Sequence, residues 1–158
     1  MIQELISATT TIAAPAETVF ALLADPARHA DIDGTGWVCE PLDGEPLRHA
    51  DQVFRMAMYH DNHPDGRYEM ANAVRVFDPP RAIAWEPGQD ASGSGTVEFG
   101  GWIWRYDLAP AGPSDTTVTL TYDWSAVPPF LREHIAFPPF APEHLDNSLR
   151  HLADMAVA

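Results

Sequence analysis

The first part of the chain changes from a β-branched stretch to helical periodicity. Residues 5–12 (LISATTTI) predict a strand. Pro15 then suits the first turn of a helix, and Pro26 ends that helix and opens a second short one that stops near Ile32. The apolar stripe of the first helix consists of Val19, Phe20, Leu22 and Leu23. We therefore expect one strand followed by two short helices.

A period of two dominates the middle of the chain. Strands are predicted over residues 36–40, 52–60, 68–77, 82–86, 101–109 and 116–125. In most of them apolar or aromatic positions alternate with polar ones, the pattern of antiparallel strands that have one buried and one wet face. Residues 110–115 (PAGPSD) predict a hairpin connection.

Helical spacing returns at the end of the chain, where Pro142 can open a helix. The positions of one stripe are Leu145, Ser148, Leu149, Leu152, Met155 and Ala156. A sheet of about seven strands must cover its apolar face, and this helix is the segment that can do so. The sequence thus predicts an α+β fold in which a curved antiparallel sheet wraps around a long C-terminal helix.

Charge and composition narrow the range of functions. The 158 residues carry a formal net charge of −14, and all nine basic residues are arginines. Without lysine there is no Schiff-base chemistry and no P-loop. The acidity argues against a nucleic-acid partner or an anionic membrane surface. With 46% hydrophobic and 20% charged residues, we expect one globular domain over residues 1–158.

Cysteine use and hydropathy address compartment and covalent chemistry. The single cysteine, Cys39, excludes an intrachain disulfide, and we expect it to pack as a small hydrophobe on a strand rather than act as a nucleophile. The chain has no leader-like start and no apolar run long enough to span a bilayer, so we expect a soluble, cytoplasmic protein without membrane insertion.

Several segments carry a family resemblance. They are residues 9–36 (TTTIAAPAETVFALLADPARHADIDGTG), 77–87 (FDPPRAIAWEP), 100–110 (GGWIWRYDLAP), 117–125 (TVTLTYDWS) and 143–156 (EHLDNSLRHLADMA). With the predicted element order, the chain resembles the START-like (SRPBCC) superfamily and its bacterial polyketide cyclase/dehydrase and lipid-transport branch. The resemblance implies the helix-grip fold, with a deep apolar cavity between the sheet and the terminal helix, and supplies no catalytic motif.

The alternation places large apolar and aromatic side chains on the face that would line such a cavity. The predicted ligand-binding residues are Met56, Met58, Met70, Asn72, Trp85, Trp102, Trp104, Trp124, Ser148, Leu149 and Leu152. Methionines suit a deformable wall, and aromatic faces suit a flat ring system. For an arbitrary fold the same pattern would indicate a solid core. The resemblance to the helix-grip fold favours a pocket instead.

Four inward polar residues are the catalytic candidates, namely His60, Tyr68, Tyr106 and Tyr122. An aldol cyclisation needs a donor that polarises a carbonyl and a base that removes an α-proton, and tyrosine or histidine can serve. Each could equally be a hydrogen-bonded wall residue that orients the ligand. Arginines that steer polyketide carbonyls in cyclases have no counterpart here, since Arg55, Arg75 and Arg105 fall on the wet face by parity.

The other residues with chemically active side chains are expected to have structural roles. The run at residues 60–63 (HDNH) precedes a turn, so we expect a hairpin tip and no metal. His144 and His151 flank the terminal stripe, where solvated or mouth-lining histidines are expected. Asp33, in a predicted turn, is expected to cap or close that turn. No nucleophile elbow and no GxGxxG motif occurs.

These observations predict a protein that binds a hydrophobic, aromatic or polyketide-like small molecule in an internal cavity, with catalysis of its cyclisation or aromatisation as one form of that function. The alternative is a carrier or sensor of a lipid or metabolite without catalysis, and a third is an interaction protein of the same superfamily. No cofactor is expected. The partner is the hydrophobic ligand, with a homodimer left open, and residues 91–95 could form a lid over the cavity.

Overall fold

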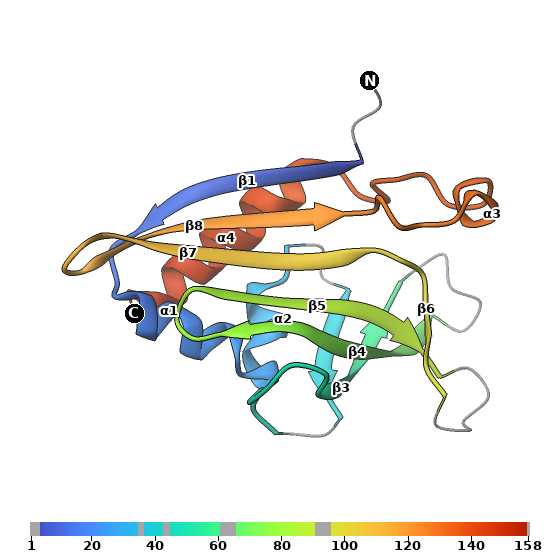
Figure 1. The fold of residues 1–158 in the computed structure, drawn as a ribbon, viewed down its shortest axis with the longest axis horizontal. Helices are drawn as coiled ribbons and strands as arrows, with labels where there is room; N and C mark the ends of the chain where they lie inside the picture. Colours follow the sequence, from blue (N-terminus) through green and yellow to red (C-terminus); the bar gives the residue numbers. More distant parts are fainter. Residues whose placement is uncertain (1–3, 35–36, 43–44, 61–65, 91–95, 158) are drawn as a thin grey trace.

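The computed structural model describes residues 4–34, 37–42, 45–60, 66–90 and 96–157. An antiparallel sheet forms the larger part of the fold (Figure 1). Its strands are β1 (Leu5–Ile12), β2 (Val38–Pro41), β3 (Val53–Tyr59), β4 (Arg67–Asp78), β5 (Ala82–Gln89), β6 (Glu98–Phe99), β7 (Ile103–Gly112) and β8 (Asp115–Asp123). The sheet order is β1-β8-β7-β5-β4-β3-β2, and β6 pairs with β5 off this path.

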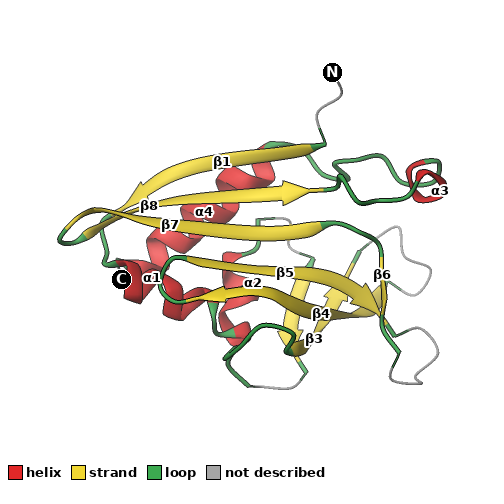
Figure 2. Cartoon of the chain, viewed as in Figure 1, coloured by secondary structure: helices red, strands yellow, loops and turns green. Residues whose placement is uncertain are grey.

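Short helices follow β1, and the longest helix ends the chain. They are α1 (Ala16–Leu23), the 3₁₀ helix η1 (Pro26–Arg28), α2 (His29–Ile32), α3 (Pro129–Arg132) and α4 (Glu143–Ala156). Figure 2 shows α4 crossing one face of the sheet behind β1, β8 and β7. The predicted α+β architecture is confirmed. Among the described helices, none combines the length and apolar character that a bilayer crossing requires.

The predicted stripe of the terminal helix is what attaches it to the sheet. Leu145, Leu149 and Leu152 are almost fully buried, together with Ser148. Arg150 and Asp154 point outward and are exposed. Burying each leucine stabilises the fold by about 1.5–3 kcal/mol, so this one helix holds a substantial share of the core.

The first helix fills one end of the space between α4 and the sheet. Pro15 stands at its N-cap position, and Val19, Phe20 and Leu23 are buried. Phe20 packs edge-on against Phe77 of β4, with ring centroids 5.4 Å apart. Because α1 also contacts α4, this end of the molecule is a solid core.

A β-bulge corrects the predicted side-chain parity of β4. The sequence placed Val76 on the same face as Val74. The pairing with β5 shifts between these two residues, so that Phe77 lies opposite Ile83. Ile83 is fully buried, and Phe77 packs against the same core. One extra residue in a strand reverses the faces beyond it, and Phe77 therefore takes the inward position expected for Val76.

Two other local predictions were wrong. Cys39 is exposed rather than packed, because β2 is an edge strand of the sheet. The strand predicted to end at residue 86 continues to Gln89, because its last residues pair with the two-residue strand β6, which the sequence did not predict.

Candidate binding cavity

A cavity of about 620 Å³ lies between the inner face of the sheet, the N-terminal half of α4, the α2 region and residues 130–140. That volume is typical of pockets that bind small organic molecules. Apolar and aromatic side chains form most of its lining. The cavity reaches the surface, since Phe130, which is 62% exposed, and Phe99 belong to the lining.

Cross-strand pairing builds the wall. Residues directly opposite each other in antiparallel strands point to the same face. On β3 and β4, Met56 pairs with Met70, and Met58 pairs with Tyr68. On β7 and β8, Trp104 pairs with Tyr122, and the two rings lie 4.5 Å apart between centroids. The period of two in the sequence therefore becomes two ladders of large side chains that line the cavity.

Most of the predicted site residues come together in this cavity. Its lining contains the four catalytic candidates His60, Tyr68, Tyr106 and Tyr122. It also contains Met56, Met58, Met70, Asn72, Trp85, Trp102, Trp104 and Ser148. Asn72 and Ser148 are buried polar groups in an otherwise apolar wall, and such groups can fix the orientation of a ligand.

Three of the predicted binding residues lie elsewhere. Leu149 and Leu152 are buried in the main core and do not belong to the cavity lining. Trp124 is buried beside Tyr122 and Val127 in a second cluster. The strand β8 ends at Asp123, so the alternation that placed Trp124 on the cavity face no longer applies at that residue.

Sequence reasoning missed several lining residues. Those from loops and helices include His29, Asp33, Trp37, Leu131, Ile135, Phe137 and Phe140. They lie outside the alternating strands, so strand parity could not identify them. Only the apolar character of residues 130–140 hinted that this segment covers something.

The turn after α2 presses against α4 and forms the polar end of the cavity. The backbone N–H of Gly34 donates to Ser148 Oγ at 3.0 Å. A Cβ at Gly34 would lie only 2.6 Å from the carbonyl oxygen of His144, so the close approach requires glycine. Asp33 Oδ2 accepts from the N–H of Val38 at 3.1 Å, which fits its predicted role in a turn. The contact with α4 adds a second role.

That contact places Asp33 beside a buried histidine. His144 Nε2 lies 4.0 Å from Asp33 Oδ1, and the side chains are 8% and 9% exposed. The His144 ring also meets Trp104 and Phe140 edge-on, at 5.4 and 4.7 Å between centroids. Of the two roles expected for His144, the solvated one is wrong, because the ring is buried against Phe140 and the Asp33 turn, whereas its place in the cavity lining agrees with the other.

Burial sets the protonation states of the histidines in the wall. It lowers the pKa of His144, against smaller raising effects of the Asp33 charge and the Gly34 backbone. It also lowers the pKa of His29, whose Nε2 hydrogen-bonds the carbonyl of Leu23 at 2.8 Å. Both rings are therefore favoured in the neutral form near pH 7, in which one ring nitrogen can accept a proton.

The cavity tyrosines act as hydrogen-bond donors, whereas the neutral histidines can accept a proton. Burial raises the pKa of Tyr106 and Tyr68 above the ordinary value, and the charge of Asp33 raises both further. Burial alone raises the pKa of Tyr122. The phenols therefore stay protonated and can donate hydrogen bonds to a ligand.

The arginines that the sequence analysis considered lie off the cavity. Arg55, Arg75 and Arg105 are absent from the lining, as the parity predicted, and pair with Asp90, Glu86 and Asp107. The run at residues 60–63 lies partly outside the described residues, and residues 91–95, which could form a lid, lie wholly outside them. Within the described ranges, no group of three or more His, Cys, Asp and Glu side chains converges on one point.

The fold and its cavity define the class of protein, namely a START-like protein with the helix-grip fold. The profile of the polyketide cyclase / dehydrase and lipid transport family matches residues 3–156. The chain belongs to this family, and membership implies the binding of a ligand.

Solved structures share the fold at low sequence identity. Protein Ms6760 from Mycobacterium smegmatis is 16% identical with a TM-score of 0.68, covering 98% of this chain and 91% of that one. Protein CV1439 from Chromobacterium violaceum is 19% identical with a TM-score of 0.66, covering 98% of both chains. A point mutant of norcoclaurine synthase from Thalictrum flavum, in complex with a transition-state analogue, is 13% identical with a TM-score of 0.64, covering 97% and 93%.

A curated relative matches over part of its length. The uncharacterized protein Rv0088 of Mycobacterium tuberculosis is 27% identical over 121 residues, which are 77% of this chain and 48% of that protein. The chain therefore spans about half the length of this curated relative.

Proposed function

We propose that this protein binds a hydrophobic, ring-containing small molecule in the cavity between the sheet and α4. The observation that carries the proposal is the composition of the wall, in which three tryptophans and three methionines share one lining, namely Trp85, Trp102, Trp104, Met56, Met58 and Met70. Flat aromatic faces favour stacking on a ring system, and methionines adapt to its outline. A few buried polar groups, such as Asn72, would orient the bound molecule.

Binding of a neutral fluorescent probe tests this function. N-phenylnaphthylamine should gain fluorescence on entering the cavity, and Trp104→Ala should weaken its binding about tenfold through the loss of one aromatic wall. Arg105→Ala is the matched control, because the neighbouring side chain points to the other face and pairs with Asp107. Equal effects of the two variants, each with a cooperative melt, would reject the cavity as the binding site.

Native mass spectrometry of the freshly purified chain addresses the natural ligand. A hydrophobic molecule that copurifies with the wild-type chain, and is lost from Trp104→Ala, would support the carrier or sensor form of the function. Its mass would identify the ligand class.

Cyclisation or aromatisation of a poly-β-ketone is the second candidate. It is favoured by neutral His144, which can accept an α-proton, in the same cavity as the protonated phenols of Tyr106 and Tyr122. A phenol that donates to a carbonyl would stabilise the enolate formed when the proton leaves. Incubation with a poly-β-ketone thioester should then change the ring pattern of the products, and identical products with and without protein would exclude this candidate.

A further inference from the structure

Two side-chain amides beside the sheet differ in their hydrogen bonding. Gln52, which comes directly before β3, accepts from the backbone N–H of Arg48 at 2.7 Å and donates to the carbonyl of Pro46 at 3.1 Å. The amide of Gln52 therefore serves the fold. The side chain of Asn72 in β4 makes no hydrogen bond with any of the residues that the structure describes. It is nevertheless the more buried of the two, with an exposed fraction of 6%.

The position of Asn72 in the sheet explains why the wall gives it no partner. It lies opposite Phe54 of β3 and Pro87 of β5, so the three side chains point to the same face. Met70 and Val74 are its neighbours on that face of β4. None of these four side chains can match an amide, because their only heteroatom is the weakly accepting sulfur of Met70. The amide of Asn72 belongs to the cavity lining, as do Phe54 and Pro87.

Such a placement is unfavourable for the free chain. An amide gives up hydrogen bonds to water when it is buried, and Asn72 regains none from the described residues. Leucine has the same branching and would fill the position without that cost. An asparagine at this point is therefore explained by a polar group that enters the cavity and pairs with it.

The amide of Asn72 also limits what that polar group can be. Its Nδ2 donates and its Oδ1 accepts, and the two atoms stand side by side. A ketone on the ligand would accept from Nδ2 and leave Oδ1 unpaired. A carboxamide or a lactam presents an acceptor next to a donor and can pair with both atoms at once. Trp85 lies opposite Val74, so its indole is a diagonal neighbour of Asn72 and can contact the ring that carries such a group.

We propose that Asn72 recognises the polar group of the ligand, and that this group is an uncharged amide, either a carboxamide or a lactam, attached to the ring system. This inference rests on the proposed function, since it names the chemical class of the ring-containing ligand. It involves binding only and requires no reaction.

Three probes of nearly equal shape separate the two hydrogen bonds from the apolar contribution. Naphthamide, acetylnaphthalene and isopropylnaphthalene, substituted at the same ring position, are titrated into the full chain by calorimetry and by displacement of N-phenylnaphthylamine. We expect naphthamide to bind most tightly, and acetylnaphthalene, which can only accept, to bind less tightly. Isopropylnaphthalene should bind at least about tenfold more weakly than naphthamide, because it leaves the amide of Asn72 unpaired.

Asn72→Leu assigns the preference to one side chain. The variant should bind naphthamide at least about tenfold more weakly and isopropylnaphthalene within about twofold of the wild-type affinity, so that the ranking reverses. The midpoint of urea unfolding of the free chain should stay the same or rise, because the substitution removes an unpaired amide and no hydrogen bond. An amide with a structural role would give a lower midpoint.

Gln52→Leu is the matched control. It also replaces an amide with leucine, but Gln52 lies outside the cavity lining and loses both of its hydrogen bonds to the backbone. We expect a lower midpoint of urea unfolding and an unchanged ranking of the three probes. The two variants should thus affect stability and ligand preference in opposite ways.

Failure of the inference can be distinguished from failure of the proposed function. If isopropylnaphthalene binds the wild-type chain as tightly as naphthamide, or if Asn72→Leu keeps the preference for naphthamide, recognition by Asn72 is overturned while the binding function stands. A lower unfolding midpoint or loss of the fold in Asn72→Leu would also overturn it, since the amide would then have a structural role. If none of the three probes binds, both the inference and the proposed function fail.

Discussion

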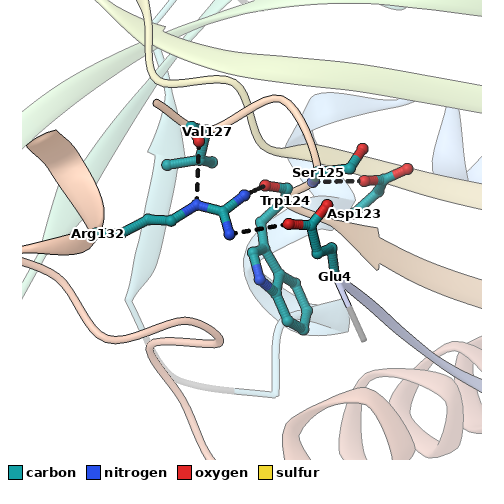
Figure 3. Close-up of polar contacts among 6 residues, drawn as sticks. All are labelled: Glu4, Asp123, Trp124, Ser125, Val127 and Arg132. Carbon is teal, nitrogen blue, oxygen red and sulfur yellow. Dashed lines mark hydrogen bonds and ion pairs between the residues drawn. The ribbon is translucent and has the colours of Figure 1, made fainter. Parts of the chain in front are cut away.

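Arg132 and Glu4 lie 128 positions apart in the chain, and their Nη1 and Oε1 atoms are 3.0 Å apart. The same guanidinium donates from Nε to the carbonyl of Val127 at 3.0 Å and from Nη2 to the carbonyl of Trp124 at 2.9 Å (Figure 3). Through these contacts α3 is fastened to the residue before β1 and to the end of β8. The fastening holds Phe130 and its neighbours at the rim of the cavity.

Replacing Arg132 with alanine should therefore loosen the rim. Loss of the three contacts of a half-buried guanidinium should lower the free energy of unfolding by about 1–2 kcal/mol. Urea unfolding measures the loss, and faster amide exchange over residues 129–135 would locate it. In the control Arg150→Ala, the lost partner is Asn147 on the same helix, and little change is expected. Equal stability of the two variants would contradict the proposed fastening.

Substitutions at Leu152 and Met58 should affect the free energy of unfolding and the ligand affinity in opposite proportions. Leu152 is 0% exposed in the core beside α1, so Leu152→Ala should cost about 2–5 kcal/mol and leave the affinity for N-phenylnaphthylamine almost unchanged. Met58 is half-buried in the cavity wall. Met58→Ala should lower the free energy of unfolding by about 1 kcal/mol or less and should weaken the binding of the probe. Parallel urea unfolding and probe titrations measure both quantities, and the reverse order of effects would show that the cavity is placed wrongly.

Strand parity predicted the cavity wall where strands are regular. The pairing of β3 with β4 is regular, and that of β7 with β8 is regular from Ile103 to Pro110, so residues such as Met56 and Trp104 could be assigned to the inner face from sequence alone. The prediction failed where the backbone departs from that period. Val76 and Phe77 are both apolar, so nothing in the pattern revealed the bulge that reverses their faces.

The polar end of the cavity could not be predicted in the same way. Asp33 and His144 come from a turn and a helix that are far apart in the sequence, and their proximity depends on how the turn after α2 packs against α4. The spacing along α4 showed that His144 flanks the apolar stripe. Its burial depends on Phe140, which precedes the helix and has no periodic relation to it.

Gly34 should be indispensable for this packing. An added Cβ would lie 2.6 Å from the carbonyl oxygen of His144 and 2.8 Å from Cβ of Asn147, so the turn would have to move away from α4. We expect Gly34→Ala to destabilise the fold by about 1–3 kcal/mol and to weaken the hydrogen bond to Ser148. Urea unfolding measures the cost. At Gly112 the nearest atom to an added Cβ is 3.6 Å away, so Gly112→Ala should cost clearly less, and a similar cost at both positions would count against this account.

The buried His29 should make the free energy of unfolding decrease as the pH is lowered. Its ring stacks on Trp85 at 4.9 Å, and burial lowers its pKa in the folded state, against the smaller effects of the Leu23 carbonyl and the Asp25 charge. The unfolded chain, in which histidine has a pKa of about 6.5, then binds more protons than the folded chain as the pH falls below that value. Stability contributed by neutral His29 is present above about pH 6.5 and is lost on acidification, by at most about 1.4 kcal/mol per pH unit.

Urea unfolding of His29→Gln and of the wild-type chain, each near neutral pH and at about pH 5.5, tests this linkage. The variant should lose less stability than the wild-type chain between the two conditions, because glutamine does not titrate. A residual dependence should remain, since burial also lowers the pKa of His144. His134 is exposed, so His134→Gln should behave as the wild-type chain does. Identical pH dependence of His29→Gln and His134→Gln would mean that His29 does not couple folding to protonation.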